Sequence, residues 1–432
     1  MAEDRVVITG TGMVCALGKA PEEVWGALLS GKTGIQSIEG FDTGGFACTS
    51  AAQVRDFDVT ELGVHPKDAR IMESHSYLLM KSTRDAFQQA GLDKTSIPRE
   101  EIGFFAGMGM VDYEVEDLLP AVVKSLDGRG RLDYSTFYSQ AYTEIYPLWP
   151  LKMLNNIGFC QVAMQLNIQG ENAVFSPHGD SGAMAVTEGM KSVRDQKAQV
   201  VLCGGVSEKV NPFSLARAHL SGTLNTADSQ NGSLCRPFAM DRKGTVLGEG
   251  CGVVALELES SARKRGVPFV ASMTGYGCSC EITNRHSGPT ARAFSLAMQG
   301  GLDRAGLNPS DIDLIIAHGD GTVSGDRNEV EAIHDVFSDC LNQVHVFSSK
   351  AALGHLLAGA PLMDVILGVC MLRDGIVPAM PHASPPEPSI RFHVLQGTSL
   401  RKEVRRILIN CQSDEGQAAS LVLETVNREK RP

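Results

Sequence analysis

An internal repeat is the feature of this sequence that most restricts how the chain can fold. Three short motifs of the first half return in the second half, in the same order. They are residues 9–12 (TGTG) with 274–277 (TGYG), 90–92 with 305–307 (both AGL), and 174–176 with 346–348 (both VFS). Repetition on the scale of half a 432-residue chain predicts two copies of one structural unit that pack against each other.

Strand-like and helix-like segments alternate within each copy. Residues 5–10 and 102–107 are apolar, end at glycine and have the pattern of buried strands. Residues 68–90 have the pattern of an amphipathic helix, and the glycine that follows them marks its end. This alternation predicts an α/β fold with an N-terminal half, residues 1–257, and a C-terminal half, residues 258–432.

The first half carries extra sequence at about residues 110–170, because the spacing between matched motifs shrinks along the chain. This insert holds most of the tyrosines and one of the two tryptophans of the chain. Aromatic side chains contribute large buried areas at interfaces and in cores. We expect the following residues to line a tunnel or an interface, with added core packing as the alternative: Tyr113, Phe137, Tyr138, Tyr142 and Trp149.

The composition argues against several classes of protein. Lys and Arg number 39 against 50 Asp and Glu, and this net charge of −11 disfavours binding to nucleic acid or to an anionic membrane surface. No apolar run approaches the roughly 20 residues that a membrane span needs. The 11 cysteines form no CxxC pair and lack metal-ligand spacing. We therefore expect a soluble, cytoplasmic protein without a structural metal.

Polar residues gather where two strands of the second half are expected to end. His318 follows the strand-like run 314–317, and Lys350 and His355 follow the motif at 346–348. The carboxyl ends of strands are where α/β folds place their binding and catalytic groups. His318, Lys350 and His355 are therefore the candidate catalytic residues.

Two other motifs suggest different chemistry. Residues 26–33 (GALLSGKT) fit the phosphate-loop pattern, but they lie inside an expected helix rather than between a strand and a helix. Residues 179–182 (GDSG) are similar to the nucleophile segment of serine proteases, although those are all-β proteins. A serine hydrolase that uses Ser181 and His318 stays open as an alternative.

Several longer segments resemble the β-ketoacyl-acyl carrier protein synthases, and together they cover nearly the whole chain. They are residues 7–12, 25–34, 201–208, 236–252, 317–319 and 350–355. The resemblance implies a thiolase-like fold, a duplicated α-β-α-β-α arrangement of five layers. It also implies that His318, His355 and Lys350 match the two histidines and the lysine of that family.

The sequence departs from this family at the position of the nucleophile. Active members are acylated on a Cys at a helix N-terminus, where the helix dipole and nearby amides favour the thiolate and the developing oxyanion. Gly179 stands at that position and cannot carry an acyl group. The glycine-rich gating loop of the family is also replaced, by residues 413–418 (SDEGQA), and Asp320 stands where the family usually has Thr.

With these departures, and in residues 356–365, the sequence resembles the chain-length factors. These are the nucleophile-free partners of type II polyketide synthases. The resemblance implies a heterodimer with an active ketosynthase, an acyl carrier protein that bears the malonyl or polyketide chain, and no cofactor. The strand that contains Phe175 would then pair across the dimer two-fold, and the insert would shape the partner's tunnel. Two alternatives stay open: a malonyl-carrier-protein decarboxylase that uses His318 and His355, and a non-catalytic homodimeric scaffold.

Overall fold

The central sheet of the chain repeats its own strand order. In the computed structural model, the described residues are 4–112, 115–176, 178–226, 234–283, 288–381 and 385–426. The first half contributes β1 (Val6–Cys15), β7 (Glu249–Leu258), β6 (Val200–Glu208), β4 (Ile102–Met108) and β5 (Asn172–Phe175). The second half contributes β8 (Ala271–Cys280), β15 (Gln417–Thr425), β14 (Arg406–Gln412), β9 (Leu314–Ile316), β10 (His345–Phe347) and β12 (His393–Val394).

These strands form one sheet in the order β12-β10-β9-β14-β15-β8-β1-β7-β6-β4-β5. Read outward from the β1–β8 contact, the run β1-β7-β6-β4-β5 is matched by β8-β15-β14-β9-β10. In each run the first two pairings are antiparallel and the last two are parallel. The internal repeat therefore corresponds to a duplicated unit, and the three motif pairs occupy equivalent strands and helix ends.

The repeated glycines explain how each unit packs a helix onto its first strand. A Cβ at Gly12 of β1 would lie 2.0 Å from the carbonyl oxygen of Ser82 in α3 (Ser74–Gln89). A Cβ at Gly277 of β8 would lie 2.0 Å from the carbonyl oxygen of Ala297 in α11 (Ala291–Ala305). Only glycine allows these backbones to approach so closely, so the same motif serves the same purpose in both halves.

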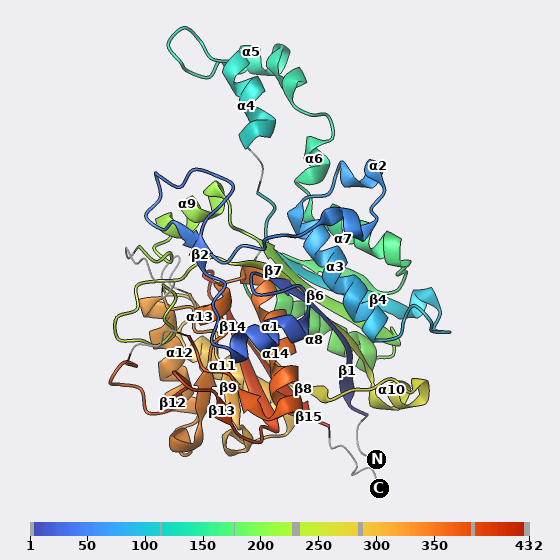
Figure 1. Cartoon of the computed structure of the whole chain (residues 1–432), viewed down its shortest axis with the longest axis vertical. Coiled ribbons are helices and arrows are strands. Elements are labelled where there is room, and N and C mark those ends of the chain that lie inside the picture. Colours follow the sequence, from blue (N-terminus) through green and yellow to red (C-terminus); the bar gives the residue numbers. More distant parts are fainter. Residues whose placement is uncertain are drawn as a thin grey trace.

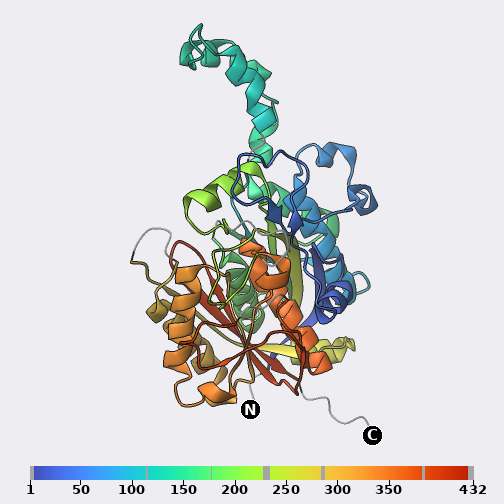
Figure 2. The same cartoon turned by 60° about the vertical axis from the view of Figure 1, so that its left-hand side comes forward.

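The helices form three layers around the two halves of the sheet (Figures 1 and 2). Buried α8 (Ser181–Arg194) and α14 (Ala360–Asp374) share one apolar core with strands of both halves. Helices α3 and α7 (Asn155–Leu166) cover the outer face of the first half, while α11 and α12 (Val323–Val336) cover that of the second. The predicted five-layer α-β-α-β-α fold is confirmed.

Residues 115–152 of the insert form an arm that extends away from the layered body (Figures 1 and 2). Its elements are α4 (Val115–Lys124), α5 (Tyr134–Ser139), the 3-10 turn η3 (Ala141–Glu144) and α6 (Trp149–Lys152). The arm is held together internally by packing of α4 and α5 on η3 and by the ion pair between Lys124 and Glu144. At its root, Lys152 forms an ion pair with Glu73 of the body at 2.9 Å.

The helix expected over residues 68–90 is interrupted, which corrects that prediction. A short α2 ends at Ala69 (Pro66–Ala69), and α3 begins only at Ser74. The break carries Met72 inward, where it is 4% exposed within the core between α3 and the sheet. Burial of this side chain outweighs the propensity of the segment to stay helical.

Shorter elements complete the described part of the chain. The helices are α1 (Pro21–Leu29), α9 (Pro212–Leu220), α10 (Glu259–Arg265) and α13 (Lys350–Leu353). Two small antiparallel sheets pair β2 (Gln36–Ser37) with β3 (Ser50–Ala51), and β11 (Ile376–Val377) with β13 (Leu400–Arg401). Within the described ranges, we find no helix with both the length and the apolar character that a bilayer crossing requires.

Candidate functional site

His318 lies just past the carboxyl end of β9, in a turn that Glu329 of α12 holds in place. The two carboxylate oxygens of Glu329 accept the backbone N–H bonds of His318 and Gly319, each at 2.9 Å. Gly319 and Gly321 adopt φ angles of +43° and +82°, so the turn requires glycine at both positions. The His318 ring is buried, and its Nδ1 accepts the N–H of Gln412 at 3.2 Å.

The ring of His355 meets that of His318 edge to face, with centroids 5.0 Å apart. Its Nδ1 accepts the N–H of Leu357 at 3.3 Å, so each ring uses Nδ1 as an acceptor and carries its proton on Nε2. Burial, with Lys350 nearby, lowers the pKa of His318 to about 4. Burial, with His318 and Lys350 nearby, holds the pKa of His355 well below its ordinary value. At neutral pH the pair therefore consists of two uncharged N–H donors.

Lys350, at the start of α13, is fixed by a buried ion pair with Asp364 of α14. Its Nζ lies 3.5 Å from Oδ2 of Asp364, and both side chains are 1% exposed. Ser349 donates its hydroxyl to Oδ1 of the same carboxylate at 2.5 Å. Burial raises the pKa of Asp364, while Lys350 and Ser349 favour its charged form. This arrangement keeps a cation close enough to the histidines to lower the pKa of both.

Asp320 is the group that faces the histidine pair. Its Oδ1 accepts both the N–H and the hydroxyl of Thr322, each at 2.8 Å, and its Oδ2 accepts the side-chain amide of Gln412 at 3.3 Å. The same Oδ2 lies 3.7 Å from Nε2 of His318. Burial alone would raise the pKa of Asp320, but the contacts with His318, His355 and Thr322 outweigh it and place this pKa below its usual range. A buried carboxylate anion therefore stands beside the histidines.

A cavity of 300 Å³ opens beside His355 and Asp320. Its walls come from α9, from the segment that contains Gly179, and from residues 412–415. Burial, with Asp320 and Glu415 nearby, raises the pKa of Asp414 in this wall to about 7. The cavity thus brings a histidine, an ionised carboxylate and a second titrating carboxyl group into one space.

Gly179 precedes α8 and lies against the second half of the chain. A Cβ at this position would lie 2.7 Å from the carbonyl oxygen of Gln412, whereas ordinary contact begins at 3.4 Å. The strand end that carries Gln412 thus closes over the place where a nucleophile's side chain would begin. Ser181, two residues on, is buried in the first turn of α8. Among the described residues, Nε2 of His318 has no hydrogen-bond partner, so the structure shows no Ser–His pair of the kind that a serine hydrolase needs.

The segment in place of a glycine-rich gate is a tight turn between β14 and β15. The N–H of Ser413 bonds to the carbonyl of Gln417, and the N–H of Gly416 bonds to the carbonyl of Ser413. Glu415 in this turn lies 3.1 Å from Nδ1 of His178, next to Gly179. The turn is therefore pinned to the segment before α8.

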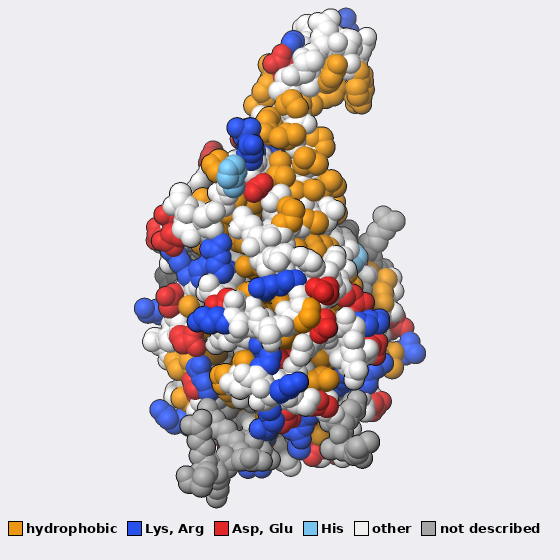
Figure 3. Space-filling model, turned by 90° about the vertical axis from the view of Figure 1, so that its right-hand side faces the viewer, with side chains coloured by type: hydrophobic (Ala, Val, Ile, Leu, Met, Phe, Trp, Pro, Cys, Tyr) orange, Lys and Arg blue, Asp and Glu red, His pale blue; other side chains and the backbone are white. Residues whose placement is uncertain are grey.

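The described aromatic residues of the insert do not line this cavity. Tyr138 and Tyr142 on the arm are 71% and 53% exposed, and Phe137 and Trp149 are partly buried within it. Tyr113 lies outside the described residues. Figure 3 shows hydrophobic side chains gathered along the arm and on the body next to it. The exposed ones in the insert include Leu119, Val123, Leu126, Tyr134, Tyr146, Leu148, Leu154 and Met164.

Phe175 lies at the end of β5, the outermost strand on the first-half side of the sheet. It is half-buried and packs its ring 6.3 Å from that of Phe105 in β4. In the described part of the chain β5 pairs with β4 alone, so its other edge offers free backbone N–H and C=O groups. This is the strand that the sequence predicts to pair with a partner.

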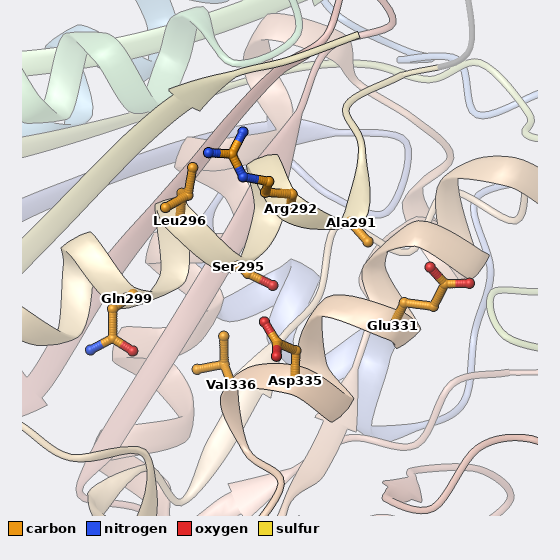
Figure 4. Close-up of a pocket in the computed structure, with 8 residues that line it drawn as sticks. All are labelled: Ala291, Arg292, Ser295, Leu296, Gln299, Glu331, Asp335 and Val336. Atoms are coloured by element: carbon orange, nitrogen blue, oxygen red, sulfur yellow. The ribbon is translucent and has the colours of Figure 1, made fainter. Parts of the chain in front are cut away.

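A second hollow, of 610 Å³, lies between α11 and α12 on the outer layer of the second half. Figure 4 shows Arg292, Gln299 and Asp335 at its walls, and none of the candidate site residues is among those that line it. Among the described residues, no cluster of three His, Cys, Asp or Glu is arranged to hold a metal ion. The histidine cavity is therefore the candidate functional site.

Comparison with known families assigns the chain. Residues 3–262 match the N-terminal domain of β-ketoacyl synthases, and residues 270–384 match the C-terminal domain. The chain belongs to the β-ketoacyl synthase family. Among its relatives is the 3-oxoacyl-[acyl-carrier-protein] synthase 2 of Staphylococcus aureus (strain COL), 28% identical over 421 residues, which cover 97% of this chain and 98% of that protein. The synthase of the same name from Coxiella burnetii is 27% identical and covers 99% and 100%.

Solved structures of β-ketoacyl synthases agree with this assignment. The ishigamide ketosynthase/chain length factor is 26% identical, with a TM-score of 0.85 over 99% of this chain and 100% of that one. A β-ketoacyl synthase from Burkholderia phymatum STM815 has a TM-score of 0.87 over 98% and 100%, at 23% identity. At 23% identity, the likeness to the Burkholderia phymatum structure shows a shared fold and nothing more.

Sequence reasoning missed the acidic residues that hold the site together. Glu329 and Asp364 lie 11 and 14 positions after the residues that they fix, His318 and Lys350. Asp364 nevertheless left a signal, because it is an isolated acid in the otherwise apolar first turns of α14, and buried acids are usually paired. Asp414 left none, since acidic residues are common in surface turns.

Proposed function

We propose that this chain is a chain-length factor, a ketosynthase-like subunit without its own nucleophile. In this proposal it forms a heterodimer with an active ketosynthase and acts on chains carried by an acyl carrier protein. The partner performs the condensation, while this subunit helps to shape the space in which the polyketide grows. Its contribution is steric and organisational rather than chemical.

The observation that carries the proposal is the state of the nucleophile position. Gly179 has no side chain to acylate, and the carbonyl oxygen of Gln412 lies only 2.7 Å from where a Cβ would be. A chain that had lost only its cysteine would keep room for one. The closed position argues for a protein in which acylation at this site has no role.

The turn at residues 413–416 supports the same proposal. An active ketosynthase must open and close access to its acylated residue, and a glycine-rich loop gives the backbone the freedom to do so. Here Ser413 hydrogen-bonds within the turn, and Glu415 contacts His178. A turn fixed in this way fits a subunit that does not gate a reaction.

The arm and the free edge of β5 support a permanent partner. Contiguous exposed apolar side chains on a protein surface mark an interaction site, and an unpaired strand edge is a template for a further strand. Tyr138 and Val123 on the arm are 71% and 57% exposed. The likeness to the ishigamide ketosynthase/chain length factor favours a ketosynthase as the protein that covers this surface.

The two alternatives are weaker. A decarboxylase requires the two Nε2–H donors, which His318 and His355 retain, but the carboxylate of Asp320 lies beside them. A homodimeric scaffold would also cover the arm and β5. It would leave the resemblance to chain-length factors at residues 356–365 without a functional reason.

Co-expression with the ketosynthase encoded nearest to this chain tests the proposal. We expect a stable 1:1 complex by size-exclusion chromatography and native mass spectrometry, with this chain poorly behaved alone. Placing a charge in the interface by Val123→Glu should weaken the complex at least tenfold. Leu296→Glu, at a 50% exposed position on α11, is the matched control and should leave it intact. A well-behaved homodimer that ignores the ketosynthase would contradict the proposal.

A further inference from the structure

Asp320 is placed so that the two histidines differ in how a ligand in the cavity can reach them. His355 and Asp320 line the cavity, whereas His318 is not among the residues that line it. Nε2 of His318 is buried without a hydrogen-bond partner, and the nearest carboxylate oxygen, Oδ2 of Asp320, lies 3.7 Å away. A ligand in the cavity therefore reaches His355 directly but meets Asp320 on the way to His318.

We propose that Asp320 is the residue that stops the retained histidine pair from binding a developing oxyanion, so that this site rejects malonyl thioesters. The inference deepens the proposed function, on which it rests, by naming a second cause of catalytic silence. The loss of the nucleophile prevents acylation at Gly179. Asp320 prevents decarboxylation, which needs no nucleophile.

The chemistry of decarboxylation shows why a carboxylate at this place matters. The bond between Cα and the carboxyl carbon of the malonyl group breaks, and CO2 leaves. The electron pair moves toward the thioester oxygen, which becomes an enolate, and Cα then takes a proton from water to give the acetyl thioester. The barrier falls when fixed donors point at that oxygen as it gains negative charge. Two neutral Nε2–H groups are suitable donors.

Asp320 places negative charge where the enolate oxygen would need its donors. Three hydrogen bonds, two from Thr322 and one from Gln412, hold its carboxylate, so it cannot easily turn away. Two anions in a buried site repel each other strongly, because the local dielectric constant is low. Asp320 thus raises the energy of the transition state rather than lowering it.

The charges around the cavity add to this effect. Asp320, Asp414 and Glu415 line it, whereas Arg217, the described cation in its lining, is bonded to Asp112 at 2.8 Å. The carboxylate of a malonyl group therefore finds no free cation among the described lining residues. The cavity suits an uncharged acyl or amide group better than an anionic extender.

Removing only the charge of Asp320 tests the inference. Asp320→Asn keeps the size of the side chain and an oxygen for Thr322, and Asp320→Thr introduces the residue usual in the family. We expect either variant to release labelled CO2 from malonyl-N-acetylcysteamine at least a hundredfold faster than the unaltered chain, which corresponds to about 2.7 kcal/mol. The gained activity should disappear in the double variant with His318→Ala.

Asp335→Asn, at an exposed position on α12 outside the cavity, is the matched control. It should leave the rate unchanged. A folded Asp320→Asn or Asp320→Thr variant without gained activity would overturn the inference, and so would an equal gain in Asp335→Asn. Every one of these variants should still form the complex with the ketosynthase. If the complex does not form, the result counts against the proposed function and not against the inference about Asp320.

Discussion

The two halves of this molecule share one fold but treat their site segments in opposite ways. After β5, the first half has Gly179, which has no side chain, shortly before its helix α8. After β9 and β10, the second half keeps His318, Lys350 and His355 in a network of buried hydrogen bonds and ion pairs. The difference lies in what each segment contributes to folding.

Each retained group of the second half is bonded to the scaffold around it. Glu329 ties down the turn of His318, and Asp364 neutralises Lys350. Removal of one member would leave a buried partner unsatisfied, which is costly whether or not the site is active. A nucleophile in the first half has no buried partner that depends on it. Gly179 can therefore stand in its place, which allows Gln412 to pack closely. Retention of the histidines is therefore not in itself evidence of activity.

The largest effect that this comparison predicts concerns the buried pair of the second half. Asp364→Ala leaves the ammonium of Lys350 buried without its anion, and we expect it to lower the free energy of unfolding by about 3–5 kcal/mol. Urea denaturation followed by circular dichroism measures this change. Because both partners are 1% exposed, water cannot replace the lost contact.

The double variant Lys350→Met/Asp364→Leu is the control for that prediction. Replacing both charges by apolar side chains of similar size should recover most of the lost stability. A cost of under about 1 kcal/mol for Asp364→Ala alone would show that the second half does not keep its charged residues for folding. The histidines and the lysine would then need a functional explanation.

Part of this architecture was predictable from the sequence, because the repeat acts through local geometry. The glycines at 10, 12, 275 and 277 mark close helix–strand contacts, and Gly91 and Gly306 end α3 and α11 with φ angles of +65° and +67°. His318, Lys350 and His355 were predictable as strand-end residues. The contact between Gly179 and Gln412 was not, since it joins residues more than half the chain apart without any shared pattern. The sequence also did not predict that the arm projects from the body, because exposed aromatic residues have the same sequence pattern as buried ones.

The duplicated glycines allow the likeness of the halves to be tested. Gly12→Ala and Gly277→Ala each place a methyl group 2.0 Å from a helix carbonyl, so the helix must shift. We expect each to cost about 1–3 kcal/mol of stability, and the two costs to be similar. Differential scanning calorimetry of the two variants makes this comparison.

Gly26→Ala is a suitable control, because a Cβ at this position in α1 has nothing within 4 Å. It should stabilise the chain by about 0.5–1 kcal/mol, as alanine is the better helix former. If Gly12→Ala were tolerated while Gly277→Ala was not, α3 and α11 would differ in how tightly they are held. The structural equivalence of the halves would then not extend to their energetics.

The last prediction depends on pH and concerns Asp414, where the second half closes over the first. Burial, with Asp320 and Glu415 nearby, raises the pKa of Asp414 from 3.8 to about 7. The folded chain therefore holds this proton more tightly than the unfolded chain does. The resulting stabilisation is complete below pH 3.8 and is lost as the pH rises to about 7.

As the pH rises, the contribution of His318 to stability is gained while that of Asp414 is lost. The difference in melting temperature between the unaltered chain and a variant is therefore more informative than the pH profile of one protein. The lowered pKa of His318, about 4, means that its contribution is lost as the pH falls from 6.5 to 4. We expect Asp414→Asn to gain melting temperature relative to the unaltered chain as the pH rises from 4 to 7. Asp335→Asn, an exposed change on α12, should follow the unaltered chain throughout. Parallel profiles for all three proteins would mean that the turn at 413–416 stays open to solvent, and that the second half does not seal the position of Gly179.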